Sequence, residues 1–157
     1  MAYPNPASQD AQAYAALRYG FRVARATGVT AQTGVIAIFT VVGGRVDITK
    51  IVGQVTTQLQ GAANDMKLIG NPTAGSDVDL CAVVETNGKE VGSLLGITGL
   101  ASDAMIAANA GGLSAQARPV TVNSGTIDQS SAASRTGSIQ WTCWYIPLDE
   151  GAYVTAA

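Results

Sequence analysis

Residues 77–98, DVDLCAVVETNGKEVGSLLGIT, carry the strongest local fold signal in the chain. Asn87-Gly88 separates two apolar runs, and this dipeptide favours a type I′ turn because both central residues of that turn need positive φ. A two-residue turn also fixes the register of the flanking strands. One face of the resulting hairpin would hold the pairs Val84–Val91, Ala82–Ser93, Leu80–Leu95 and Val78–Ile97. Three of these pairs are apolar on both sides, so the stretch predicts an antiparallel hairpin with one buried face.

A second hairpin is predicted around Gly43-Gly44. The run 35–42, VIAIFTVV, is apolar and β-branched, and Gly43-Gly44 would turn it into a second strand over 45–55. A two-residue turn would pair Val41 with Val46 and Phe39 with Ile48. Residues 56–60 are predicted to extend the second strand of this hairpin, and further strands are predicted at 65–70, 117–123 and 138–147. Residues 71–76 and 124–137 read as loops, the latter with a short extended stretch near Ile127, while 100–110 fit a short helix or, preferably, strand or irregular structure.

The closing stretch 138–147, SIQWTCWYIP, holds both tryptophans of the chain. They are three residues apart, so on a strand of period two they point to opposite faces. Trp141 shares its face with Ile139, Cys143 and Tyr145, the more apolar set, and is predicted to lie in the core. Trp144 shares its face with Gln140 and Thr142 and is predicted to contact the N-terminal arm or a neighbouring subunit.

The N-terminal region differs in charge from the rest of the chain. Pro4 and Pro6 favour an extended arm, and Ser8 is suited to cap a short helix that continues through AQAYAALRYGF. On that helix Tyr14, Leu17 and Phe21 would lie near one face, and Arg18, Arg22 and Arg25 would follow at spacings of four and three. One interpretation is the solvated face of a packed helix. The other is a clasping arm that lies on an acidic partner.

About eight short strands separated by turns predict an all-β fold, an antiparallel, jelly-roll-like β-sandwich with an extended or partly helical arm. A chain of 157 residues is long enough for one such domain. The predicted division is 1–34 for the arm and linker and 35–157 for the sandwich. Cys81 and Cys143 are read as two buried apolar side chains; a disulfide would require their two strands to come together.

Composition restricts the chemistry. The chain has no histidine, which excludes a Ser-His-Asp triad, a Cys-His pair and imidazole zinc ligands. Phosphate-binding loops of the GxxxxGK[ST] and GxGxxG kinds do not occur, and Asp77 with Asp79 alone supplies too few oxygens for a cation. We therefore expect no enzyme activity, catalytic residue, metal or cofactor. A net charge of −2 argues against nucleic acid as a partner.

The charged fraction is low, at 13%, against 47% apolar residues, which favours permanent assembly into something larger. The first ten residues lack the basic-then-apolar pattern of a signal peptide. The longest uncharged run, 26–44, is too polar for a transmembrane helix. The expectation is a chain made in the cytoplasm with no membrane partner.

Three segments resemble the small head-decoration or cement proteins of tailed DNA phages. IFTVVGGRVDITKIVGQVTT resembles their first long hairpin, LIGNPTAGSDVDLCA their middle, and IQWTCWYIPLDEGAYV their closing strand. The resemblance begins at Ile38 and does not include residues 1–34. It implies a homotrimer on the capsid exterior that stabilises the shell by bridging major capsid proteins.

The expected function is thus that of a non-enzymatic virion protein. The candidate interaction residues are Tyr14, Arg18, Phe21, Arg22, Arg25 and Trp144. The alternatives are a tail or fibre-base component and a carbohydrate- or receptor-binding module. An exposed Trp144 or Trp141 would support the carbohydrate-binding alternative.

Overall fold

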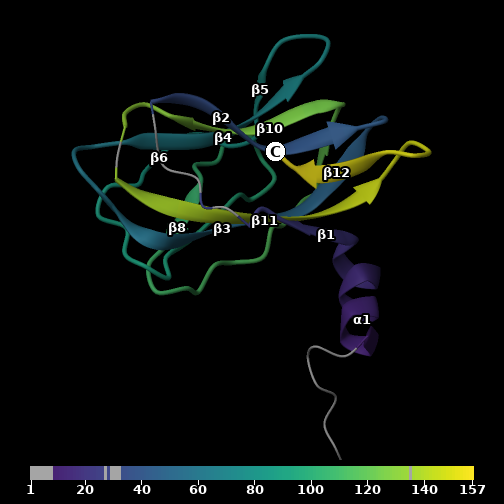
Figure 1. Ribbon diagram of the computed structural model, residues 1–157, viewed down its shortest axis with the longest axis horizontal. Coiled ribbons are helices and arrows are strands. Elements are labelled where there is room, and N and C mark those ends of the chain that lie inside the picture. The colour runs from purple at the N-terminus through teal and green to yellow at the C-terminus, as the bar shows by residue number, and fades with distance from the viewer. Residues whose placement is uncertain (1–8, 27, 29–32, 135) are drawn as a thin grey trace, which may run out of the picture.

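Figure 1 shows the computed structural model of the chain, which describes residues 9–26, 28, 33–134 and 136–157. Two sheets pack face to face, and every pairing between named strands is antiparallel, so the predicted all-β sandwich is confirmed. The described residues form twelve strands rather than about eight. The predictions for Pro4, Pro6 and Ser8 and for most of the 27–33 linker fall outside the described residues.

Each sheet contains six strands. Sheet A has the order β1 (Phe21–Ala24), β11 (Thr136–Pro147), β3 (Val46–Gln60), β7 (Leu94–Gly96) and β8 (Ile106–Ala108), and β9 (Val120–Val122) also pairs with β3. Sheet B has the order β12 (Tyr153–Ala156), β2 (Gly34–Val42), β10 (Gly125–Ser131), β4 (Asp65–Pro72) and β5 (Val78–Asp79), and β6 (Val84–Glu85) also pairs with β4. The single helix of the described residues, α1 (Gln9–Tyr19), extends away from the sandwich on the side of sheet A (Figure 1).

The core lies between the two inner faces. Sheet A contributes alternate residues of its long strands, and sheet B supplies the opposite layer. The largest fully buried side chains are Trp141, Phe39, Ile38, Ile48, Ile51, Leu59, Met66, Leu68, Leu95, Ile97, Met105 and Ile127. Trp141 is 0% exposed, as predicted, and its indole Nε1 donates to Gln129 Oε1 at 3.0 Å. This bond satisfies the one polar group that the buried ring carries.

The hairpin predicted over residues 77–98 is wrong. β5 and β6 pair with β4 in sheet B, whereas β7 pairs with β3 and β8 in sheet A. Residues 86–89 do form a turn, with Lys89 N donating to Thr86 O at 3.3 Å, but positive φ occurs at Gly88 and not at Asn87, so the turn is not type I′. Gly88 N bonds Leu59 O at 2.8 Å instead of a hairpin partner. The stretch therefore carries the chain from one sheet to the other.

The hairpin predicted around Gly43-Gly44 is wrong in the same way. Both strands exist, but β2 lies in sheet B and β3 in sheet A. The connection is held by the Arg45 guanidinium, whose nitrogens donate to both carboxylate oxygens of Asp149 at 3.0 and 2.7 Å, and by Arg45 N, which donates to Asp149 Oδ2 at 2.7 Å. The side-chain hydrogen bond from Arg45 lowers the pKa of Asp149 to about 2. This contact fastens the β2–β3 turn to the β11–β12 turn.

One strand was predicted only in part and another was not predicted. Residues 124–137 were read mainly as a loop, yet β10 is a seven-residue strand between β2 and β4. Its polar side chains misled the prediction, because Asp128, Gln129 and Ser131 are buried. β12 follows the Asp149 turn and pairs with β2 at the edge of sheet B. By contrast, the strands predicted near Val120 and over 138–147 are confirmed, as is the preference for strand or irregular structure over 100–110, where β8 follows an irregular segment.

Cys81 and Cys143 are free and buried, which confirms their reading as apolar side chains. Burial raises the pKa of the Cys143 thiol to about 12 and also raises that of Cys81. Cys81 Sγ accepts a hydrogen bond from Leu68 N at 3.3 Å. Both thiols are therefore protonated at neutral pH and poor nucleophiles.

Gly53 on β3 should tolerate no larger residue, because the Trp141 ring packs directly on it. A Cβ there would lie 2.7 Å from the Trp141 ring and 2.9 Å from Ile139, so Gly53→Ala should lower the free energy of unfolding by about 1–3 kcal/mol through overpacking. Gly70→Ala is the matched control, because its Cβ would lie 3.3 Å from Val78, at the end of a side chain. Urea unfolding measures both. Equal stability of the two variants would contradict the packing of Trp141 on Gly53.

Candidate functional site

Three neighbouring strands place two cations beside an indole on the outer face of sheet A. Arg22 on β1, Trp144 on β11 and Lys50 on β3 lie opposite one another in register. Lys50 Nζ lies 5.1 Å and Arg22 Cζ 5.9 Å from the Trp144 ring centroid. Both distances fall within the range of cation–π attraction, which favours this arrangement of two like charges.

The end of α1 adds a second aromatic ring to this row. Tyr19 meets Trp144 edge to face, with centroids 6.4 Å apart, and Lys50 Nζ lies 5.4 Å from the Tyr19 centroid. Arg18 Cζ lies 5.1 Å from the same ring. We call Arg18, Tyr19, Arg22, Lys50 and Trp144 the basic face.

Gly20 sets the position of Tyr19. Gly20 has φ +87° and its N–H donates to Ala16 O at 2.8 Å, which ends the helix. A Cβ at this position would lie 2.0 Å from the Tyr145 carbonyl oxygen, so only glycine allows the chain to pass from helix to edge strand here. The Thr49 hydroxyl lies within hydrogen-bond distance of Tyr19 O and Trp144 O, at a one-residue bulge of β3.

A groove of about 240 Å³ runs from the basic face along the outer side of sheet A. Beyond Arg22, Lys50 and Trp144, its lining consists of three polar and three apolar side chains: Gln54, Gln140, Thr142, Val52, Leu94 and Leu113. The groove is therefore a shallow surface of mixed polar and apolar side chains with two cations at one end.

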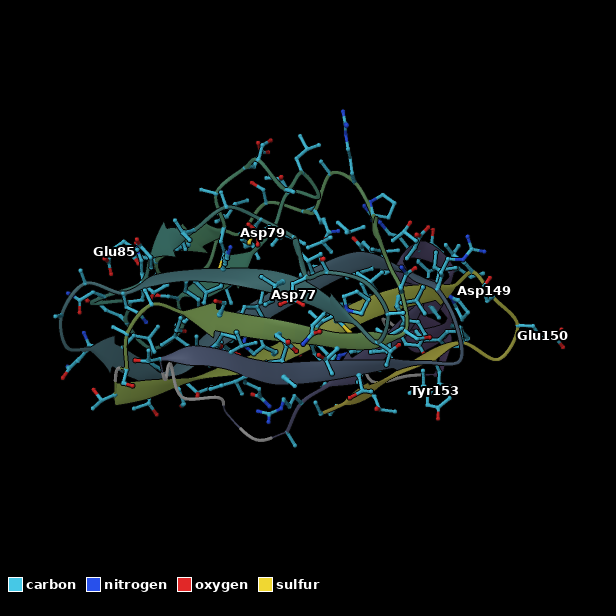
Figure 2. The ribbon with its side chains drawn as sticks, turned by 90° about the horizontal axis from the view of Figure 1, so that it is seen from above. Asp77, Asp79, Glu85, Asp149, Glu150 and Tyr153 are labelled. Atoms are coloured by element: carbon cyan, nitrogen blue, oxygen red, sulfur yellow. The ribbon has the colours of Figure 1, made fainter. Side chains whose placement is uncertain are left out.

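The cations of the basic face have no carboxylate partner among the described residues. Ion pairs in that part of the chain join Arg45 to Asp149 and Lys67 to Asp79, each at 2.7 Å. Asp47 lies on the same strand as Lys50, but it accepts a hydrogen bond from Thr121 Oγ1 at 2.6 Å. Other acids lie elsewhere: viewed from the side of sheet B, Figure 2 shows Glu85 at one end of the sandwich and Asp149 with Glu150 at the other.

The structure brings together three of the six predicted interaction residues: Arg18, Arg22 and Trp144. Phe21 points to the opposite face of β1 and packs against Tyr145 with centroids 5.7 Å apart. Arg25 Nε donates to the backbone oxygen of Ala157 at 2.9 Å. Tyr14 lies on α1 and is 75% exposed, outside the basic face.

The prediction that Arg18, Arg22 and Arg25 lie on one helix is wrong. The helix ends at Tyr19, so Arg22 lies on β1 and Arg25 directly follows that strand. Residues 1–34 are predicted from the sequence to form an arm and linker, but β1 within that range is an edge strand of sheet A, with Val23 packed against the core. Tyr19 and Lys50 were missed. Gly20 could have indicated that the helix ends at Tyr19, because glycine is common just after a helix. No local signal could have identified Lys50, because it reaches the site through its register with Trp144.

The two tryptophans should differ sharply in their contribution to stability. Trp141→Ala should cost about 3–5 kcal/mol, because it empties a buried site and leaves Gln129 without its donor. Trp144→Ala removes surface contacts only and should cost about 1 kcal/mol. Guanidinium unfolding followed by far-ultraviolet circular dichroism measures both. Similar losses in the two variants would contradict the assignment of opposite faces.

The basic face is the feature of the described residues that offers most to a partner. Within those residues, no group of three or more Cys, Asp or Glu side chains is placed to hold a metal ion. No helix among them is long and apolar enough to span a membrane. No protein-family model, no curated protein and no solved structure matches this chain.

Proposed function

We propose that this chain is a non-enzymatic structural protein of a tailed-phage particle, of the head-decoration or cement type. It assembles as a homotrimer on the capsid exterior and stabilises the shell by bridging major capsid proteins. The sequence resemblance supports this proposal. Its three segments fall on β2–β3, on β4–β5 and on β11–β12, so they span both sheets of the sandwich.

The projecting helix is the observation that carries the proposal. Tyr14 and Leu17 on α1 are 75% and 86% exposed, and the helix extends away from the sandwich (Figure 1). An isolated helix of eleven residues is marginal in water, because nucleation is costly and helical stability in proteins comes mainly from packing. A partner that covers these side chains would supply that packing, as expected for a protein that binds adjacent capsid proteins.

The carbohydrate-binding alternative receives less support. A sugar-binding tryptophan offers an open ring face, whereas the ring of Trp144 is approached by Lys50, Arg22 and Tyr19. A tail or fibre-base role uses the same kind of surface as a capsid role. The location of the protein on the particle distinguishes these two.

Two measurements test the proposal. Multi-angle light scattering at micromolar concentration should give a mass of about three times the 16.0 kDa of the chain. Electron cryomicroscopy of the parent particle should place the protein on the outer surface of the head. A single 16.0 kDa species, or density confined to the tail, would overturn the proposal.

The double variant Tyr14→Ser/Leu17→Ser should remain folded and lose attachment to its partner. These side chains are exposed, so the melting temperature should be unchanged, whereas truncating two interface residues weakens binding by about tenfold or more. Val91→Ser is the matched control, because Val91 is 63% exposed in a loop of the sandwich. Co-sedimentation with purified capsids measures attachment. Equal attachment of the double variant and the control would show that α1 is not the contact.

A further inference from the structure

We infer that the basic face is a docking site for an acidic polypeptide segment, bound through Asp or Glu carboxylates to Arg22 and Lys50. The inference depends on the proposed function in one respect: that function assigns the acidic segment to a capsid protein. It goes further in naming the chemistry of the partner and the residues that recognise it.

The first step is the charge that the chain leaves uncompensated. Arg18, Arg22 and Lys50 are gathered within two strands and one helix end, and among the described residues none of them forms an ion pair. Gathering like charges costs free energy through mutual repulsion. A carboxylate placed between Arg22 and Lys50 would remove that cost, so the face is electrostatically complementary to an anion.

The second step is the choice of a carboxylate over a nucleic acid. Nucleic-acid binding needs cations along a backbone and free aromatic faces for the bases. Here three cations act together, and the Trp144 and Tyr19 rings already contact cations and each other. Beside them, the amides of Gln54 and Gln140 line the groove, where they suit the peptide groups of an extended segment.

The third step is the choice of another protein over a second copy of this chain. Many acids of the chain are already engaged: Asp79 pairs with Lys67, Asp149 pairs with Arg45, and Glu85 accepts hydrogen bonds from Asn64 N and Asn87 N. Asp103 accepts from Thr98 Oγ1, and Asp128 is buried. The exposed acids Glu85 and Glu150 lie at opposite ends of the sandwich, the latter beside the half-buried Asp149 (Figure 2). They do not form a single patch that would match the basic face.

Fluorescence polarisation with a labelled twelve-residue Glu-rich peptide tests the inference on the full chain. Arg22→Gln/Lys50→Gln should weaken binding by at least about tenfold, and binding to the wild type should weaken as salt rises from about 50 to about 300 mM. Lys89→Gln is the control. It removes one positive charge, as each of the two substitutions in the double variant does. Lys89 lies far from the basic face, because its backbone O accepts from Leu59 N, and Leu59 is nine residues, or about 30 Å, along β3 from Lys50. Melting temperatures of all variants confirm that each is folded.

The inference would be overturned if Lys89→Gln weakened peptide binding as much as Arg22→Gln/Lys50→Gln does. It would also be overturned if the wild type bound single-stranded DNA more tightly than the peptide, or if light scattering showed that the basic face binds a second copy of the chain in place of the peptide. The proposed function is tested separately by capsid co-sedimentation. If Arg22→Gln/Lys50→Gln attaches to capsids as strongly as the wild type does, the inference fails and the proposed function stands. If the peptide binds as expected but the wild type does not attach to capsids, the proposed function fails and the inference stands.

Discussion

Trp141 connects the two sheets of this sandwich. Its ring rises from β11 in sheet A, lies against the bare backbone of Gly53 on β3, and donates to Gln129 on β10 of sheet B. The buried indole thus needs a small residue beside it and a polar residue opposite it. The amide of Gln129 is acceptable in the core because the indole satisfies one of its polar atoms. This placement explains three features of the sandwich. It joins the two sheets, it gives Gln129 of the buried strand β10 a hydrogen-bond donor, and, because strand side chains alternate, it directs Trp144 to the outer face.

Local pattern predicted the strands far better than their partners. The 138–147 strand and its two faces could be read from strict alternation, since Ile139, Trp141 and Cys143 all point inward. Both predicted hairpins failed, because a two-residue turn signal at Gly43-Gly44 or Asn87-Gly88 does not reveal whether the chain returns in its own sheet or crosses to the other. β10 was predicted only as a short extended stretch near Ile127, because residues 124–137 are rich in Ser, Thr and Gly, which is typical of a loop, and the partner that lets Gln129 be buried, Trp141, is not visible in the local pattern.

The candidate site shows the same division. Arg22 was predicted from the basic character of the N-terminal region, and Trp144 from its place on the more polar face of its strand. Their meeting with Lys50 depends on the order β1-β11-β3, which pairs residues 22, 144 and 50 and has no local signature. A surface of this kind combines an aromatic anchor with cations that have no carboxylate partner in the described chain. That combination is characteristic of recognition surfaces, in which charge complementarity directs the partner and buried rings supply affinity.

The chain crosses repeatedly from one sheet to the other, and this has a consequence for how the protein folds. The longest pairing of sheet A joins β3 to β11, and the centre of sheet B needs β10, so neither sheet can be completed until the last third of the chain is available. Long loops must close before these contacts form, and topologies of this kind fold in about milliseconds to seconds. On the ribosome, β2 and β3 would wait with their apolar faces exposed until β10, β11 and β12 emerge. Rapid completion of synthesis, or chaperone cover during it, therefore protects this chain from aggregation.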